Sequence, residues 1–334
     1  MKIGIVTQPL LNNYGGILQN YALQESLRKM GHDPITIDYI PPRKSLLRHF
    51  CAMLRVIICQ CFGKKRSLSK REFFCRRPQF ESFVNDRINK TPTIHEYGKC
   101  KEFKDVKCFI VGSDQVWRPR YNRNIGNLFL NFCRHENRLT RIAYAASFGV
   151  DEWEFSPKQT LLCSRLAKLF RAISVREQSG IRLCKEYLGV DAAWVLDPTL
   201  LLKKEDYLQL CKEVPFCDQE FLAVYVLDEN ERIITEYEKE AEKRGLVVKK
   251  FYADSESTLS VPEWLAMFRD ATCVVTDSFH GTVFSIIFGK EFKCVFNDGR
   301  GMTRFESLLK LYNFGKLDEM REYSLNWLKE SLEK

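Results

Sequence analysis

The sequence predicts an α/β protein with two doubly wound domains that face each other across a cleft. Short apolar runs rich in β-branched residues alternate with helical stretches along the 334 residues. Strands that are separated by helices pair mainly in parallel, and two such series indicate two domains. A chain of this length, with 45% hydrophobic residues, is also too long for one core. We therefore expect the ligand site in the cleft between the domains.

The first series of strands assigns residues 1–198 to an N-terminal domain, and the second assigns residues 199–316 to a C-terminal domain. Residues 317–334 are predicted to form a closing helical tail. The predicted strands of the first domain span residues 2–7, 34–38, 108–111, 142–146, 172–175 and 193–196. Those of the second domain span residues 221–227, 247–251, 273–276 and 292–296.

The turn after the first strand ends in two glycines, Gly15 and Gly16, where a helix begins. Glycine lets a ligand approach the backbone closely, and Asn13 adds a side chain that both donates and accepts hydrogen bonds. The spacing differs from the G-x-G-x-x-G of a dinucleotide site. The alternative is a turn in which glycine only eases the start of the helix.

Polar and aromatic side chains follow the strand 108–111, in the order Ser113, Asp114, Gln115 and Trp117. Ligands of open α/β sheets bind beyond the carboxyl ends of strands. Asp114 can accept hydrogen bonds from a sugar diol or take a proton from it, while Trp117 can stack on the sugar ring. The alternative is a capping turn in which Trp117 is simply packed.

Three further residues are candidates for substrate binding. Ser147 is the polar side chain of a loop of small residues that admits a ligand to the backbone. Arg176 directly follows the strand 172–175, where a guanidinium can hold a carboxylate or phosphate through two parallel bonds. Its alternative role is a local ion pair, with the adjacent Glu177 as partner. Arg304, near the edge of the second domain, is a similar case.

Residues 273–289 carry the most informative pattern, a buried strand, the polar turn 277–280 and a helix from residue 282. The turn brings His280 to the carboxyl end of the strand, where the N-terminus of a helix attracts anions. Ser278 and Phe279 share this turn and are candidates for substrate contact. The alternative for His280 is a structural histidine.

The net charge of +9 is concentrated in residues 43–81, which hold 11 basic and 2 acidic residues, while the rest of the chain carries 41 of each. This segment includes an apolar run, residues 50–62, that is too short to span a bilayer but suited to lie on one. It predicts contact with an anionic membrane surface, and a solvated helical insertion is the alternative. Nucleic acid is not expected as a partner, because no reading helix, zinc module or RNA-binding motif is present.

The 13 cysteines contain no C-x-x-C pair, and many stand in apolar runs, as expected for reduced core residues. The chain starts with a strand pattern instead of a cleavable leader, and no apolar run approaches 18 residues. We therefore expect a cytoplasmic protein, peripheral at the inner membrane if residues 43–81 bind it. No metal site is predicted, because the histidines other than His280 stand apart from suitable ligand partners.

Six motifs, in this order, resemble the polysaccharide pyruvyl transferase family. They are Asn-Asn-Tyr-Gly-Gly, Gly-Ser-Asp-Gln-Val-Trp, Tyr-Ala-Ala-Ser-Phe-Gly, Ser-Val-Arg-Glu, Leu-Asp-Pro-Thr and Thr-Asp-Ser-Phe-His-Gly. The resemblance extends to about residue 311 and leaves out residues 43–81. It implies two Rossmann-like domains arranged as in GT-B glycosyltransferases, with the acceptor side in residues 1–198 and the donor side in residues 199–316.

The resemblance also implies a reaction, the transfer of a pyruvyl group from phosphoenolpyruvate to two hydroxyls of one sugar to form a cyclic ketal in a cell-surface or capsular polysaccharide. His280 would protonate the substrate, Arg176 would hold its carboxylate or phosphate, amides near Ser278 would add donors, and Asp114 is a weaker candidate base. The acceptor would be a saccharide, free or on a lipid carrier. Phosphoenolpyruvate is a co-substrate, no bound cofactor is required, and an added divalent cation stays open.

Two other function classes remain open from the sequence. A GT-B glycosyltransferase would use a nucleotide sugar and bind UDP or GDP in the cleft. A non-catalytic carbohydrate-binding protein would keep its function in a His280→Ala variant.

Overall fold

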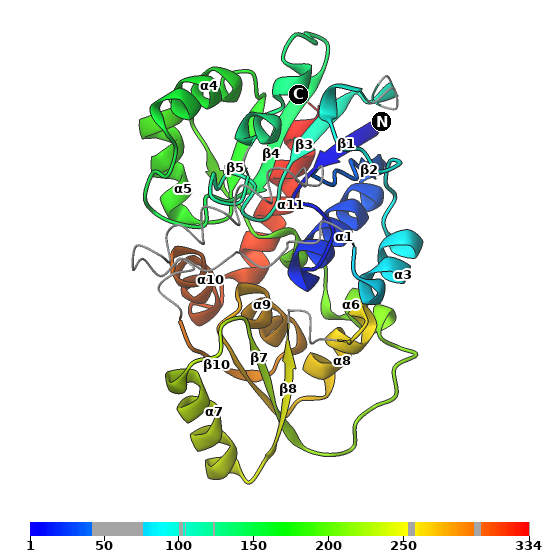
Figure 1. The fold of residues 1–334 in the computed structure, drawn as a ribbon, viewed down its shortest axis with the longest axis vertical. Coiled ribbons are helices and arrows are strands. Elements are labelled where there is room, and N and C mark those ends of the chain that lie inside the picture. Colours follow the sequence, from blue (N-terminus) through cyan, green and yellow to red (C-terminus); the bar gives the residue numbers. More distant parts are fainter. Residues whose placement is uncertain are drawn as a thin grey trace, which may run out of the picture.

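Two parallel β-sheets organise the chain, one above the other in Figure 1. The computed structural model describes residues 1–41, 76–99, 103, 105–122, 124–252, 258–296 and 302–333. All ten predicted strands are present, and the α/β fold with two doubly wound sheets is confirmed.

The first sheet has six parallel strands in the order β2-β1-β3-β4-β5-β6. They are β1 (Lys2–Val6), β2 (Asp33–Thr36), β3 (Cys108–Val111), β4 (Thr140–Ala146), β5 (Ala172–Val175) and β6 (Ala193–Trp194). The chain passes from β1 to β2 on one side and then returns to place β3 on the other side of β1. The strand order therefore reverses between β1 and β3, which is where open α/β sheets bind ligands.

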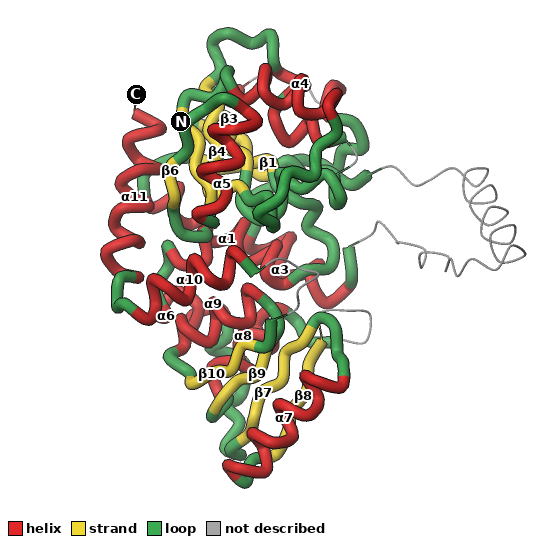
Figure 2. The backbone as a smooth tube through the Cα atoms, turned by 90° about the vertical axis from the view of Figure 1, so that its left-hand side faces the viewer, coloured by secondary structure: helices red, strands yellow, loops and turns green. Residues whose placement is uncertain are grey.

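The second sheet repeats this plan with four parallel strands in the order β10-β9-β7-β8, which lie side by side in Figure 2. They are β7 (Phe221–Val226), β8 (Val247–Tyr252), β9 (Cys273–Thr276) and β10 (Glu291–Cys294). Here the order reverses between β7 and β9, so the turn that carries His280 follows a strand at the reversal point.

Helices cover both sheets. The described ones are α1 (Tyr14–Lys29), α3 (Pro78–Arg87), α4 (Pro157–Ala167), α5 (Gln178–Leu183), α6 (Lys204–Leu210), α7 (Glu231–Arg244), α8 (Val261–Asp270), α9 (Phe279–Phe288), α10 (Thr303–Asn313) and α11 (Leu317–Glu333). Local sequence explains their starts: α4 and α8 each begin with a serine N-cap, a proline in the first turn and a capping box.

The closing helix α11 returns to the first domain. Leu328 and Leu332 are buried in one cluster with Ile3 and Ile5 of β1, and Figure 2 shows α11 beside the first sheet. The predicted tail thus contributes to the core of the N-terminal domain.

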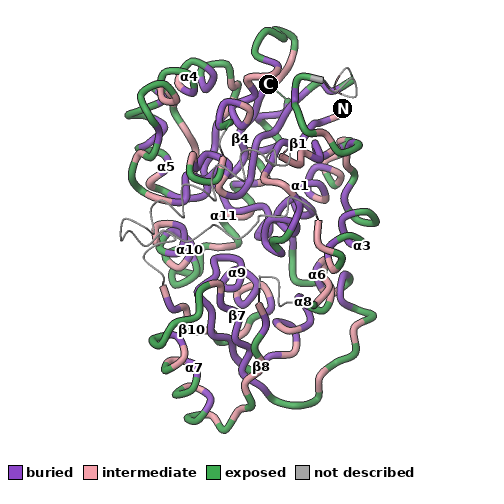
Figure 3. The backbone as a smooth tube through the Cα atoms, viewed as in Figure 1, coloured by how far each residue is buried: buried purple, intermediate pink, exposed green. Residues whose placement is uncertain are grey.

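A large apolar cluster contains residues of both domains. Tyr14 of α1 stacks on Trp264 of α8 with ring centroids 5.1 Å apart, and its hydroxyl donates to the carbonyl of Leu259 at 2.5 Å. Phe80 of α3 packs edge-on against Tyr14 at 4.6 Å. Buried segments of α1 and α9 accordingly lie in the middle of the molecule in Figure 3.

Most of the predicted basic insertion, residues 43–75, lies outside the described residues. Its last residues are described, and they belong to the fold, since Phe80 is fully buried in the core between the domains. Among the described helices, none combines the length and the apolarity needed to cross a lipid bilayer.

Candidate active site

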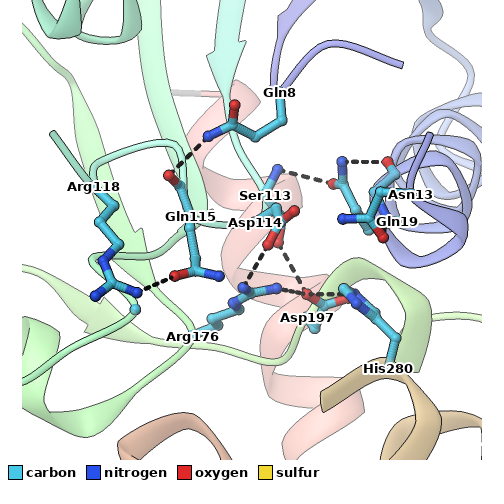
Figure 4. Close-up of polar contacts among 12 residues, drawn as sticks. Gln8, Asn13, Gln19, Ser113, Asp114, Gln115, Arg118, Arg176, Asp197 and His280 are labelled. Carbon is cyan, nitrogen blue, oxygen red and sulfur yellow. Dashed lines mark hydrogen bonds and ion pairs between the residues drawn. The ribbon is translucent and has the colours of Figure 1, made fainter. Parts of the chain in front are cut away.

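Four charged or titratable side chains meet where the two domains touch (Figure 4). Arg176, after β5, donates to Asp114 Oδ1 at 2.8 Å and to Asp197 Oδ2 at 2.6 Å. Asp114 follows β3 and Asp197 follows β6, so these three residues come from loops at the carboxyl ends of the first sheet. His280 comes from α9 of the second domain, and its Nε2 lies 3.9 Å from Asp197 Oδ2.

Two protein carboxylates pair with Arg176 through its two terminal nitrogens. Burial alone would lower its pKa, but Asp114 and Asp197 more than offset this effect and raise it. The partners in this ion pair are therefore Asp114 and Asp197, not the adjacent Glu177 that the sequence suggested. Such a buried pair holds the loops after β3, β5 and β6 together, and removing one partner of a buried pair costs about 3–5 kcal/mol.

Glu177 instead binds backbone amides of a neighbouring loop. Its Oε1 accepts hydrogen bonds from the amides of Phe148, at 2.7 Å, and Gly149, at 3.2 Å. Burial raises the pKa of Glu177, although Arg176 and Arg304 oppose the shift. Glu177 thus fixes the loop of Ser147, a residue that is itself fully buried.

Helix α9 begins at Phe279, earlier than residue 282 as predicted from the sequence. The reason is the N-cap Ser278, whose hydroxyl accepts a hydrogen bond from the amide of Gly281 at 3.3 Å. The predicted turn is therefore partly helical, and His280 stands in the first turn of the helix. The side chain of His280 is only 9% exposed.

The surroundings of His280 keep it neutral. Burial lowers its pKa from 6.5; Asp197 and Asp114 oppose this shift, while Arg176 and Arg304 add to it. The net effect is a lowered pKa, so the free protein holds a neutral imidazole at pH 7.

The start of α1 meets this imidazole directly. A Cβ on Gly15 would lie 2.0 Å from His280 Nδ1, so the glycine is required for the close approach of the two domains. Asn13 is the N-cap of α1 and accepts a hydrogen bond from the amide of Gly16 at 3.2 Å. In this structure Asn13 and Gly16 therefore form a helix cap, which is the alternative considered for this turn.

Trp117 does not present a face to a ligand. It is fully buried, stacks on Phe129 with centroids 4.6 Å apart, and donates from Nε1 to the carbonyl of Leu128 at 2.9 Å. The prediction that Trp117 stacks on a sugar is therefore wrong, because both its ring and its N–H group are packed in the core of the first domain.

Ser113 and Gln115, in the same loop, bind different partners. Ser113 points into the site, where its hydroxyl donates to Asp197 Oδ2 at 3.1 Å. The side chain of Gln115 instead accepts a hydrogen bond from Arg118 at 3.1 Å. Asp114 adopts a φ of 69°, a left-handed conformation that aspartate tolerates better than most residues.

Arg304 and Phe279 complete the site. The guanidinium carbon of Arg304 lies 5.5 Å from the centre of the Phe279 ring, and that of Arg176 lies 4.9 Å from it. Burial, together with the like charge of Arg176, lowers the pKa of Arg304 to about 10. Arg304 therefore carries a charge that an incoming anion would stabilise.

Two site residues were missed by the sequence reasoning, Asp197 and Glu177. Asp197 had a signal, since it follows a predicted strand in the motif Leu-Asp-Pro-Thr. Glu177 was seen only as a neighbour of Arg176. Within the described ranges, no three His, Cys, Asp or Glu side chains are grouped as a metal ion would require.

Two solved structures are similar to this chain in fold. The UDP-GlcNAc 2-epimerase of Neisseria meningitidis, solved with UDP-GlcNAc, matches with a TM-score of 0.52 and 11% identity over 99% of each chain. A putative UDP-N-acetylglucosamine 2-epimerase of Listeria monocytogenes matches with a TM-score of 0.50 and 11% identity, over 98% of this chain and 94% of that one. These likenesses establish a GT-B fold.

No curated protein sequence matches the chain significantly. A family model does, however: that of polysaccharide pyruvyl transferase matches residues 13–298, which is most of the chain and includes every site residue described above except Arg304. The chain belongs to the polysaccharide pyruvyl transferase family.

Proposed function

We propose that the protein transfers the pyruvyl group of phosphoenolpyruvate to two hydroxyls of one sugar residue, forming a cyclic ketal during the synthesis of a cell-surface or capsular polysaccharide. The observation that carries the proposal is the position of His280. Its neutral imidazole is buried at the junction of two helix N-termini, those of α1 and α9, close to the buried Arg304. Membership of the family supports a transferase, and the GT-B fold supports a two-domain site.

Phosphoenolpyruvate carries a carboxylate and a phosphate, and the surroundings of His280 suit an anion. Arg304 has a pKa lowered to about 10 by burial and by Arg176, and a bound anion would offset both effects. Helix α9 adds the partial positive charge of its N-terminus at the same place. We assign the substrate anion to this helix end and to Arg304, because an anion would stabilise the charge that burial and Arg176 disfavour there.

The chemistry needs one group that first gives a proton and later takes one. A bound carboxylate and phosphate would favour the protonated form of His280, so that substrate binding prepares the acid. The imidazolium then gives its proton to C3 of phosphoenolpyruvate, and the π electrons of the C2–C3 bond form the new C–H bond. C2 becomes an oxocarbenium-like centre.

A sugar hydroxyl then attacks C2 and loses its proton to the neutral imidazole. The second hydroxyl then attacks C2 and displaces phosphate, which leaves with the electron pair of its bond to C2 and takes up the proton of that hydroxyl. Asp114 is the weaker base in this scheme. Burial would raise its pKa, but Arg176, His280 and Arg304 hold it below the usual value, which makes its carboxylate a poor proton acceptor.

The alternative is a GT-B glycosyltransferase that uses a nucleotide sugar, as a GT-B structure bound to UDP-GlcNAc suggests. One observation disfavours it. At the carboxyl end of β7, Asp277 accepts hydrogen bonds from the amides of Leu227, at 2.6 Å, and Asp228, at 3.1 Å. A carboxylate therefore occupies these two amides, which are then not available to a pyrophosphate.

Calorimetric titration separates these functions. We expect saturable binding of phosphoenolpyruvate and none of UDP, GDP or nucleotide sugars. Arg304→Gln should weaken the binding of phosphoenolpyruvate roughly 10- to 100-fold, because a charge-assisted hydrogen bond contributes about 1.5–3 kcal/mol. Arg182→Gln is the matched control, since the Arg182 side chain is 52% exposed and pairs with Glu186 on the surface of the first domain.

Binding of a nucleotide in place of phosphoenolpyruvate would support the glycosyltransferase function. No binding of either, together with carbohydrate binding that His280→Ala leaves intact, would support the non-catalytic function. Formation of a ketal on a sugar acceptor, lost in His280→Ala, would complete the case for pyruvyl transfer.

The acceptor is proposed to be a saccharide, in the cell still attached to a lipid carrier, which the basic segment would meet at the inner membrane. A deletion that tests this must end at residue 75, because Phe80 belongs to the core. Removal of residues 43–75 should weaken pelleting with anionic liposomes and leave the binding of phosphoenolpyruvate unchanged. Equal pelleting of both proteins would refute the membrane contact.

A further inference from the structure

Asp197 is held in one orientation by its own turn. Its Oδ1 accepts hydrogen bonds from the amide of Thr199, at 3.1 Å, and from the Thr199 hydroxyl, at 2.7 Å. These two bonds direct Oδ2 into the site, where it accepts from Arg176 at 2.6 Å and from Ser113 at 3.1 Å. The side chain of Asp197 is fully buried, so its carboxylate cannot turn away into solvent.

The carboxylate of Asp197 faces one particular edge of the imidazole. Oδ2 lies 3.9 Å from His280 Nε2, a buried atom that has no hydrogen-bond partner among the described residues. Gly15, at the start of α1, packs over the face of the ring instead, since a Cβ there would lie 2.0 Å from Nδ1 and 2.2 Å from Cγ. A carboxylate attracts an N–H group and repels a lone pair.

The approach of Asp197 to Nε2 therefore favours one arrangement of the ring proton. We infer that Asp197 is a positioning residue that fixes neutral His280 with its proton on Nε2, which leaves Nδ1 as the atom that exchanges protons with the substrate. The other charged groups that act on the imidazole are Asp114, Arg176 and Arg304. Asp197 differs from them in its direct approach to one ring nitrogen.

If His280 acts as in the proposed function, this tautomer determines which ring nitrogen transfers protons. During protonation of C3 the proton would leave Nδ1 of the imidazolium, while Nε2 keeps its proton beside Asp197. Attack by the sugar hydroxyl would return a proton to Nδ1. The ring would thus act as acid and then as base through one nitrogen, without turning.

The tautomer can be observed without substrate, by nitrogen-15 NMR of the full-length protein labelled at histidine. The chain has five histidines, and the signals of His280 are those lost in His280→Gln. We expect a protonated Nε2 and an unprotonated Nδ1 at neutral pH. In Asp197→Asn this preference should be lost, and the pKa of His280 should fall, because a carboxylate that favours the imidazolium is gone.

Asp114→Asn is the matched control, since it removes the other carboxylate of Arg176 but not the one that approaches Nε2. It should lower the pKa of His280 and leave the tautomer unchanged. If Asp197→Asn fails to fold, the wild-type spectrum still decides, since a proton on Nδ1 would overturn the inference. An Nε2–H tautomer that persists in folded Asp197→Asn would also overturn the assignment to Asp197, and neither result depends on whether phosphoenolpyruvate binds.

Discussion

The buried charges of the site are arranged around one neutral ring. Arg176 is matched by Asp114 and Asp197, so the three form a rigid ionic group before any ligand arrives. Burial of a charge is expensive unless it is paired. The imidazole of His280 avoids this cost by remaining neutral, and its lowered pKa has a measurable consequence for stability.

We expect His280 to make the folded protein less stable in mild acid. The folded state resists protonation of His280, whereas the unfolded chain binds a proton near pH 6.5. Above that pH neither state is protonated, and the contribution to stability is fully present. As the pH falls below about 6.5, the unfolded state binds more protons and stability is lost.

The measurement is the free energy of unfolding by urea between pH 7.5 and about 5, for the wild type and for His280→Gln. The stability of the wild type relative to the variant should fall as the pH falls. A difference that stays constant over this range would show that His280 titrates alike in both states. A difference that grows toward acid would mean that the imidazolium is favoured in the fold.

At the scale of elements, strands were predictable and the ends of helices were less so. Strands such as β3 and β7 are continuous apolar runs, and a parallel sheet buried on both faces requires that pattern. The start of α9 was misplaced because a serine cap acts through one local hydrogen bond. Trp117 was misassigned because its stacking partner Phe129 is brought to it only by the fold.

The contact between α1 and α9 could not be predicted for a similar reason. The sequence shows a glycine pair after the first strand, but it does not indicate which of the two meets another element. In the structure a Cβ on Gly15 would collide with His280, while a Cβ on Gly16 would lie 3.4 Å from its nearest neighbour, Asn13. Alanine substitutions at these two adjacent positions are therefore a matched pair of variants, of which only Gly15→Ala should disturb His280.

Gly15→Ala should displace the imidazole and lower kcat/KM for ketal formation about 100-fold, since a misplacement of about 1 Å can cost that much. Gly16→Ala should keep most of the activity. Alanine favours a helix over glycine by roughly 0.5–1 kcal/mol, so neither variant loses activity through a weakened α1. Equal activity of the two variants would contradict the close contact of Gly15 with His280.

At the scale of the whole molecule, the domains share a core. Tyr14 and Phe80 of the first domain lie in one apolar cluster with Trp264 and Phe284 of the second. Domains normally move relative to each other unless their interface is large and hydrophobic. This interface is apolar, and the closing helix α11 ties the end of the chain back to the first sheet.

We therefore expect the two domains to unfold as one cooperative unit. Trp264→Ala should cost about 3–5 kcal/mol, as is usual for a buried aromatic residue. Although Trp264 belongs to the second domain, the loss should reduce hydrogen-exchange protection in β3 of the first sheet as well as in β7 of the second, because local openings are then coupled to the shared core. Val247→Ala, at a site 50% exposed in β8, is the control and should change neither. Loss of protection confined to β7, or two separate unfolding transitions seen by different probes, would show that the domains fold independently and that the site is assembled by a mobile contact.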